Sequence, residues 1–184
     1  MNFFQSFFEK KQSKFFLLVP NDPAHYGAGC VFTDGKHVLC GYQPQKKSPG
    51  ISGIGGMKEI GETYLETAFR ETVEELFDIK TLPRDLLPEL LHTLHPRKMK
   101  MSKGYIQVLF SFEDLTLFLK ICKKKGVISP LYSKVPKTLG ELIQQRQVSS
   151  SAEISHLCLL PVVKHEGDIF VNPCFLEDLR EMAS

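Results

Sequence analysis

The sequence lacks several features that would assign it to a common class of protein. It has no tryptophan, and its formal net charge is only +2, so global charge argues neither for nor against a nucleic-acid partner. Its 5 cysteines are odd in number and widely spaced, with no Cys-x-x-Cys pair. A disulfide framework and a structural zinc site are therefore not expected, and reduced thiols in the cytoplasm are the simpler interpretation.

Long hydrophobic runs are also missing. The longest apolar stretch near the N-terminus, residues 15–19, is far too short to cross a bilayer. Lysines and a glutamate interrupt the phenylalanine-rich segment 1–20, and no small-residue cleavage site follows it, so a signal peptide is not expected. We expect residues 1–24 to be an N-terminal extension, and the phenylalanine-rich segment 1–20 within it to pack against the domain. A membrane-surface role for this segment is the alternative, but no membrane partner is expected.

The length and composition are those of one globular domain. The chain has 184 residues, of which 42% are hydrophobic and 24% charged, so residues 1–184 are expected to form a single domain with a substantial core. Strands are predicted at 28–33, 37–42, 105–112 and 154–163, and helices at 62–77, 113–125, 139–146 and 172–182. Residues 90–94 are assigned to a strand because Pro83 and Pro88 disfavour a helix. The alternation predicts an α/β fold with a mixed sheet.

The predicted helix 62–77 carries carboxylates on one side and an apolar stripe on the other. The stripe consists of Leu65, Ala68, Phe69, Thr72 and Leu76. The carboxylates that share a face are Glu71, Glu74, Glu75 and Asp78. Such a face is either simply solvated or holds a hard cation such as Mg²⁺. The flexible Gly55-Gly56 turn before the helix favours a phosphate-and-metal site, and the P-loop signature is absent from the chain.

The glycine turn and the acidic helix together form a specific motif. Gly56-Met-Lys-Glu-Ile-Gly-Glu62 is followed, after seven residues, by Arg70-Glu-Thr-Val-Glu-Glu75. This segment resembles the Nudix box, G-x5-E-x7-R-E-U-x-E-E-x-G-U, at every charged position. The resemblance implies a Nudix-type α/β/α sandwich and a Mg²⁺-dependent pyrophosphohydrolase, with Mn²⁺ as a substitute ion. The box loop and helix would span 55–79, and residues 114–150, longer than a minimal domain needs, would form a specificity insertion.

The chain departs from the box at three positions. Thr72 stands where an aliphatic residue is usual, Phe77 where the box has glycine, and Asp78 where it has an aliphatic residue. The last two lie at the helix exit and remove no charged group. We therefore expect activity to survive, with the end of the helix built differently.

The resemblance also assigns roles to individual residues. Glu74 and Glu75 would be the main metal ligands, with the Gly55 carbonyl as a third. Glu71 would be either a ligand or the base that deprotonates the attacking water, and both roles stay open. Glu62 would support the metal shell, and Arg70 would hold carboxylates in place; the alternative for Arg70 is a simple ion pair on the helix.

Four further positions are candidates outside the acidic helix face. Glu153 lies in a Ser-rich loop before a strand, where it is either an additional acid that binds metal or acts as base, or a surface residue. Ser52 and Lys58 flank the glycine turn and Gly56 is part of it, and all three are candidates for contact with substrate, with loop structure as the alternative. His156 is expected to be an ordinary exposed or hydrogen-bonded histidine.

The sequence leaves three functions open. The first is an enzyme that cleaves a nucleoside diphosphate linked to another moiety, in a nucleotide or nucleotide derivative. The second is an mRNA decapping enzyme, with RNA guided by basic clusters at 97–103, 120–125 and 46–47. The third is a noncatalytic nucleotide- or RNA-binding module, which the complete set of box carboxylates disfavours. A homodimer is left open as the oligomeric state.

Overall fold

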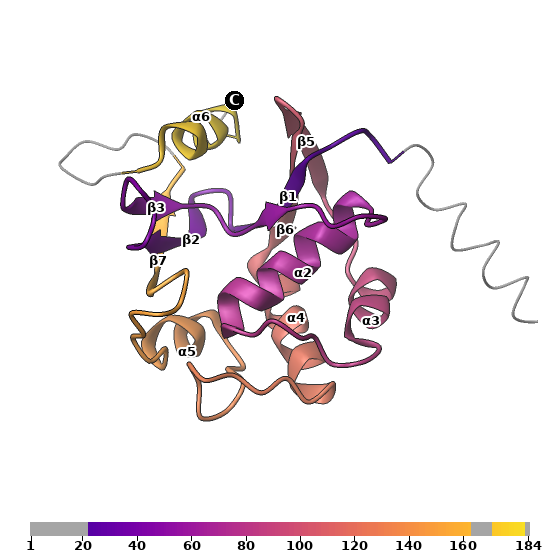
Figure 1. The fold of residues 1–184 in the computed structure, drawn as a ribbon, viewed down its shortest axis with the longest axis vertical. Helices are drawn as coiled ribbons and strands as arrows, with labels where there is room; N and C mark the ends of the chain where they lie inside the picture. The colour runs from indigo at the N-terminus through magenta and orange to yellow at the C-terminus, as the bar shows by residue number, and fades with distance from the viewer. Residues whose placement is uncertain (1–21, 163–170, 183–184) are drawn as a thin grey trace, which may run out of the picture.

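The fold is that of a computed structural model, which describes residues 22–162 and 171–182 (Figure 1). The segment 1–20, expected to pack against the domain, lies outside the described residues. The elements in chain order are β1 (Gly27–Thr33), β2 (His37–Gln43), β3 (Gly50–Ser52), β4 (Gly56–Met57), α2 (Tyr64–Phe77), α3 (Leu86–Thr93), β5 (Lys98–Ser102), β6 (Tyr105–Ser111), α4 (Phe112–Lys124), α5 (Leu139–Gln144), β7 (His156–Pro161) and α6 (Pro173–Met182).

The strands of the described residues form one mixed sheet. Its order is β3-β2-β1-β6-β5, with β7 paired to β2 and the short β4 paired to β1. β1 and β6 run parallel, whereas β2 pairs antiparallel with β1, β3 and β7. The mixed sheet predicted from the sequence is confirmed.

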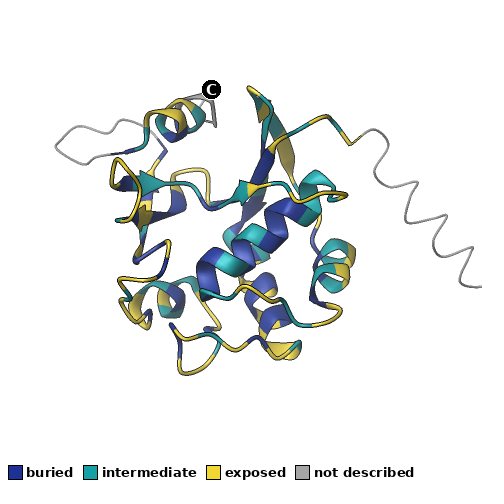
Figure 2. Ribbon diagram, in the orientation of Figure 1, coloured by how far each residue is buried: buried dark blue, intermediate teal, exposed yellow. Residues whose placement is uncertain are grey.

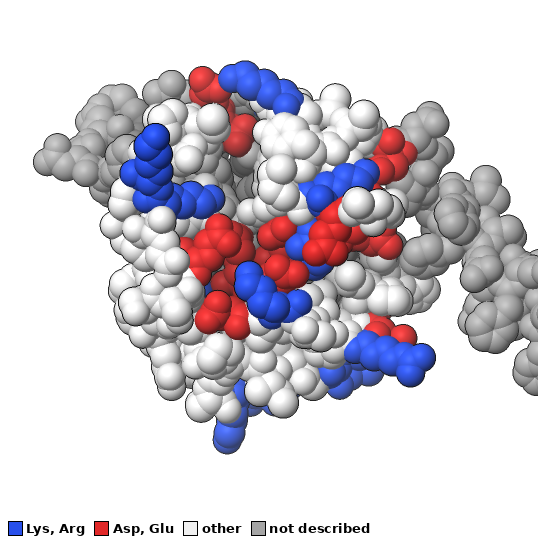
Figure 3. All heavy atoms as spheres, in the orientation of Figure 1, with Lys and Arg blue, Asp and Glu red and all other residues white. Residues whose placement is uncertain are grey.

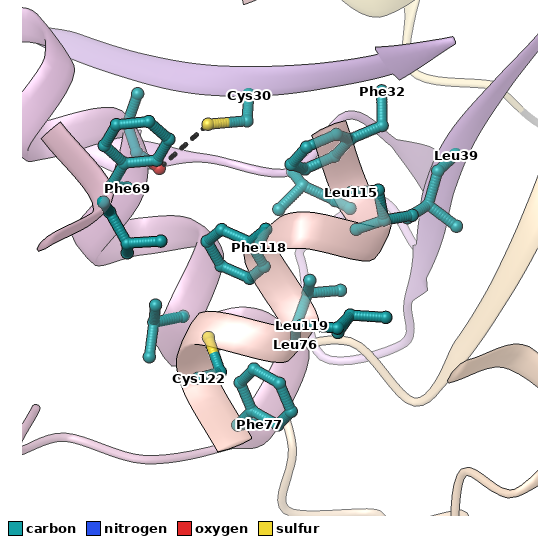
Figure 4. Close-up of a cluster of buried hydrophobic side chains, with 14 of the residues drawn as sticks. Cys30, Phe32, Leu39, Phe69, Leu76, Phe77, Leu115, Phe118, Leu119 and Cys122 are labelled. Atoms are coloured by element: carbon teal, nitrogen blue, oxygen red, sulfur yellow. Dashed lines mark hydrogen bonds between the residues drawn. The ribbon is translucent and has the colours of Figure 1, made fainter. Parts of the chain in front are cut away.

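Helices cover both faces of this sheet. Alternate residues of β1 point to opposite sides, so Phe32 enters a large core with α2 and α4, while Val31 enters a smaller core with α6. Buried aromatic rings fill the larger core (Figure 4). The ring centroid of Phe118 in α4 lies 5.9 Å from that of Phe32 and 6.4 Å from that of Phe69 in α2. Figure 2 shows the buried residues on the sides of these elements that face inward. The expected α/β/α sandwich is therefore confirmed.

Helix α2 begins two residues later than its sequence pattern suggested. Thr63 is the N-cap, and its side chain and that of Glu66 form a reciprocal capping box. The helix ends at Phe77, which is fully buried, and Asp78 adopts the left-handed conformation with φ 52°. The left-handed residue, Asp78, thus comes one position after Phe77, which stands where the box has glycine. This agrees with the expectation that the helix exit is built differently.

The strand predicted at residues 90–94 was wrong. Residues 90–93 belong to α3, whose N-cap is Asp85, and Leu94 is its C-cap. Pro88 occupies the third helical position, where the backbone N–H would have no partner within the helix, so the proline ring is tolerated there. Sequence reasoning also missed strand β5, because its alternating lysines and methionines, with Lys98 and Met99 exposed, suggest only a basic cluster.

Residues 114–150, the expected specificity insertion, contain most of α4 and all of α5. Leu115, Phe118 and Leu119 of α4 are fully buried in the larger core, so this part of the segment stabilises the domain. Its role in specificity stays a prediction. In the part of the chain that the structure describes, no helix combines the length and hydropathy needed to cross a membrane.

Candidate active site

A cleft of about 1150 Å³ opens where the loop between β3 and β4 passes over β1 and the start of β6. Acidic side chains gather in the middle of this face of the molecule, with lysines and arginines around them (Figure 3). Charged residues of the cleft include Lys46, Lys58, Arg70, Glu71, Glu74, Glu75, Lys103 and Glu153. Segments far apart in the sequence therefore contribute charge to one site.

Arg70 of α2 is the centre of the hydrogen-bond network in the cleft. Its side chain is only 9% exposed. Its Nε donates to Glu62 Oε1 at 2.6 Å, and its Nη1 donates to Glu71 at 2.9 Å and to Glu74 at 3.3 Å. Its Nη2 donates to the Met57 carbonyl at 2.7 Å and so ties the helix to β4. One buried guanidinium thereby fixes three of the box carboxylates.

Glu75 is the most buried carboxylate of the site. Its Oε2 accepts from the Gly55 backbone N–H at 2.7 Å, and its Oε1 accepts from Gln43 Nε2 at 3.2 Å. Burial raises the pKa of Glu75 well above its ordinary value, and repulsion from the Glu153 carboxylate adds to that increase. The amide of Gly55 thus contacts a carboxylate, while the predicted role of its carbonyl as a metal ligand stays a prediction.

Glu71 faces the glycine turn directly. An ideal Cβ built on Gly56 would lie 2.4 Å from the Glu71 carboxyl carbon, so a side chain at this position would displace the carboxylate from its place. Burial raises the pKa of Glu71, although the hydrogen bond from Arg70 opposes the shift. Glu153 also repels Glu71 and pairs with Lys46 at 3.6 Å. The structure therefore brings Glu153 to the acidic cluster, as the sequence suggested, although its side chain is half exposed.

Glu62 has little capacity left for another partner. Its two oxygens accept from Arg70, from Thr67 Oγ1 at 2.9 Å and from the Glu59 backbone N–H at 2.9 Å. These bonds fix the turn before α2 and the position of Arg70. Its contribution to a metal shell stays a prediction.

The remaining sequence candidates lie near the mouth of the cleft or outside it. Ser52 is half-buried at the end of β3 and lines the cleft. Lys58 also lines it and pairs with Asp22 at 3.6 Å. His156 is exposed on β7, where its Nδ1 lies 2.9 Å from Ser155 Oγ. The contact of Ser52, Gly56 and Lys58 with substrate stays a prediction.

The donor chemistry of the cleft fits a hard divalent cation. The carboxylates of Glu71, Glu75 and Glu153 repel one another, so a cation between them would be stabilised. They offer only oxygen donors, which are the ligands that Mg²⁺ and Mn²⁺ prefer. Among residues 22–162 and 171–182, however, no three His, Cys, Asp or Glu side chains are arranged to hold a metal ion by themselves. The carboxylates of Glu71 and Glu74 are turned instead toward Arg70. The oxygen donors and the negative charge of the cleft therefore suit a divalent cation, although the described side chains are not arranged around one here.

Four residues of this region were missed by sequence reasoning. Gln43 holds Glu75, Tyr105 and Gln107 line the cleft from β6, and Arg146 binds the end of α2. Gln107 had a detectable signal, because it is a polar residue within the otherwise apolar strand 105–110. For Gln43 and Arg146 no local pattern exists, since their partners lie 32 and 70 residues away.

The raised pKa of Glu75 predicts how stability depends on pH when no divalent cation is present. The folded state binds a proton on Glu75 more tightly than the unfolded state does. Protonation of Glu75 therefore stabilises the fold, and this stabilisation is complete below the ordinary pKa of 4.5. The effect is lost as pH rises through the folded pKa. In EDTA, the melting temperature should therefore fall as pH rises above about 4.5. Glu75→Gln should fall less steeply, and parallel curves for both proteins would contradict the assignment.

Comparison with known proteins gives one family match. The model of the NUDIX domain family matches residues 23–131. None of the curated proteins compared with this chain matches it.

Several solved structures match at low identity. A bifunctional NMN adenylyltransferase/ADP ribose pyrophosphatase from Francisella tularensis, complexed with AMP and a manganese ion, is 18% identical over 59% of this chain and 33% of its own, with a TM-score of 0.34. An Ap4A hydrolase from C. elegans is 19% identical over 46% of this chain and 64% of its own, with a TM-score of 0.29. A NUDIX hydrolase from Nitrosomonas europaea is 18% identical over 48% of this chain and 57% of its own, with a TM-score of 0.30. The chain thus spans about a third of the first of these proteins.

Proposed function

The chain belongs to the Nudix hydrolase family, and we propose that it is a Mg²⁺-dependent pyrophosphohydrolase that cleaves the diphosphate of a nucleotide or nucleotide derivative. The observation that carries this proposal is the acidic cluster in the cleft. Glu71 and Glu75 both have raised pKa values because they are buried beside another carboxylate, Glu153. A fold keeps such mutual repulsion in an open cleft where a cation and an anionic substrate relieve it.

Oxygen donors of α2 and the preceding loop would hold the cation. We assign Glu74, Glu75 and the Gly55 carbonyl to this role, with Glu62 supporting them through Arg70. When bound, Mg²⁺ neutralises charge on the diphosphate and stabilises the leaving oxygen, and Mn²⁺ would supply the same chemistry.

Two carboxylates are candidates for the general base. Glu71 lies against Gly56, and Glu153 approaches it from the loop before β7. The pKa of Glu71 is raised by burial, so this carboxylate accepts a proton from water more readily than an ordinary one does. Glu153 is half exposed at the cleft, within reach of solvent. Both candidates therefore stay open, and no covalent nucleophile is required.

Cationic side chains at the cleft would orient the phosphates. Lys46 and Lys58 line it, where Lys46 pairs with Glu153 and Lys58 pairs with Asp22. Parts of two of the basic clusters that suggested RNA are engaged in ion pairs, because Lys124 and Lys125 contact Glu89, and Arg97 contacts Asp114. We therefore place a small nucleotide-type substrate before capped RNA. The 5 free cysteines, three of them buried, suit a reducing compartment, and we propose the cytoplasm.

The proposed activity is tested by product identification. Purified protein with Mg²⁺ is incubated with nucleoside triphosphates, ADP-ribose, nucleotide sugars, dinucleoside polyphosphates and cap-labelled RNA. We expect cleavage at a diphosphate of a free nucleotide derivative, and loss of that cleavage in Glu74→Gln. Glu113→Gln, which changes an exposed carboxylate at the start of α4, is the matched control and should keep full activity. Release of a methylated guanosine diphosphate from RNA would favour decapping, and binding without cleavage would favour a noncatalytic module.

A further inference from the structure

A buried amide in the cleft has no role in the chemistry described above. Gln107 of β6 is 5% exposed and lines the cleft. Its Oε1 is buried and has no hydrogen-bond partner among the described residues. An unpaired buried acceptor costs a folded protein roughly 1–3 kcal/mol, so native structures seldom keep one without a compensating role. A ligand that donates a hydrogen bond in the cleft would satisfy it.

The surface next to Gln107 is aromatic. Tyr105 lies two residues earlier on the same strand, so both side chains project from the same face of the sheet. β1 has glycine beside Tyr105, and an ideal Cβ on Gly27 would lie 3.0 Å from two atoms of the Tyr105 ring. An ideal Cβ on Gly29 would lie 2.7 Å from the Tyr105 hydroxyl. Because Gly27 and Gly29 carry no side chains, the Tyr105 ring can lie close against β1.

A second ring and an apolar wall extend this surface. Tyr26 is half exposed, and its ring centroid lies 6.0 Å from that of Tyr105. Val31 and Phe175 also line the cleft. The combination is an aromatic and apolar surface, with its two rings tilted by 51°, and one polar amide beside it. That is the chemistry of a nucleobase subsite, in which aromatic faces stack on the base and an amide binds its edge.

We propose that Gln107 recognises the nucleobase of the substrate, and that this base carries an amino group next to a ring nitrogen, as adenine does. The proposal rests on the proposed function, because it places a nucleotide in the same cleft. The unpaired Oε1 requires a donor, which the amino group supplies, and the amide nitrogen donates to the adjacent ring nitrogen.

Binding of an uncleavable probe tests this subsite independently of catalysis. Adenosine and inosine α,β-methylene diphosphates differ only at this edge of the base, where adenosine has an amino group beside an acceptor ring nitrogen and inosine has an oxo group beside a ring N–H. Calorimetry should show that the wild-type protein binds the adenosine probe at least ~10-fold more tightly, the effect of one paired amide. In Gln107→Met the two probes should bind within about twofold of each other. Gln147→Met, the same change at an exposed glutamine, should keep the wild-type preference.

Two results would overturn the subsite. One is equal binding of both probes to the wild-type protein, which needs no variant, and the other is an unchanged preference in Gln107→Met. Thermal unfolding without probe verifies that this variant folds, and we expect it to, because an apolar side chain replaces an unpaired polar one. If the protein cleaved no substrate but discriminated between the probes, the hydrolase proposal would fail while the base subsite stood.

Discussion

Replacing Glu75 with glutamine should reduce kcat by about 100- to 1000-fold, because the change removes a charge that the reaction depends on while keeping the shape of the side chain. The glutamine can still accept the hydrogen bond from the Gly55 N–H, so the glycine loop keeps its position. Steady-state kinetics at saturating Mg²⁺, with the best substrate of the panel, measure the effect. More than about a tenth of the wild-type kcat in this variant would contradict a metal-binding role for Glu75.

The same variant should unfold at a higher temperature than the wild-type protein at neutral pH in EDTA. Glu75 is buried next to Glu71 and Glu153, and their repulsion opposes folding when no cation is bound. Loss of activity together with a gain in stability separates a functional carboxylate from a structural one. An equal or lower melting temperature would mean that the Glu75 carboxylate stabilises the fold.

Replacing Arg146 with methionine should lower the free energy of unfolding by roughly 3–5 kcal/mol, and the melting temperature by about 10–15 °C. This buried side chain donates to the carbonyls of Leu76 at 2.6 Å, Glu75 at 3.1 Å and Ile154 at 2.6 Å. α2 has no basic residue in its last turn, so Arg146 supplies the positive charge at its C-terminus. Methionine would leave all three carbonyls without this donor. Urea and thermal unfolding measure the loss.

Two further variants locate the origin of that loss. Arg146→Lys keeps the charge but not the fork of donors, so it should recover only part of the stability. Tyr132→Phe removes the hydroxyl that accepts from Arg146 and donates to the Leu142 carbonyl, and it should cost about 1 kcal/mol. Should Arg146→Met unfold like the wild-type protein, the three carbonyl contacts would not be stabilising, and the loop that carries Glu153 would not be fixed through Ile154.

The sequence predicted the parts of the site whose partners are close along the chain. The acidic face of α2 and the glycine turn follow from local spacing, because residues three or four apart on a helix share a face. The helix pattern also predicted the buried positions Phe69 and Leu76. Its first residue was misplaced because Glu62 could extend the helical pattern, whereas the capping box of Thr63 sets the actual start.

Contacts between distant segments could not be predicted in the same way. Arg146 reaches Leu76 across 70 residues, and Gln43 reaches Glu75 across 32. Neither residue belongs to a pattern that indicates its partner, because the sheet topology decides which segments meet. The prediction of a strand at 90–94 failed for a different reason, since a proline in the first turn does not prevent a helix.

The end of α2 shows how the chain departs from the family motif without losing a carboxylate. Phe77 fills the larger core at the position where the box has glycine, and the left-handed conformation moves to Asp78. Aspartate tolerates this conformation better than most residues. Ile79 then packs against the core, one position later than the aliphatic residue of the box.

Binding of Mn²⁺ tests the central claim most directly, since the claim is that the α2 carboxylates hold a divalent cation for cleavage of a diphosphate. The EPR signal of free Mn²⁺ is followed as the ion is titrated into the wild-type protein and Glu75→Gln, with methylenediphosphonate as an uncleavable diphosphate. We predict that the wild-type protein binds the ion, that Mg²⁺ displaces it, and that Glu75→Gln binds it at least ~10-fold more weakly. Equal binding by the two proteins, or binding that Mg²⁺ does not displace, would contradict the account.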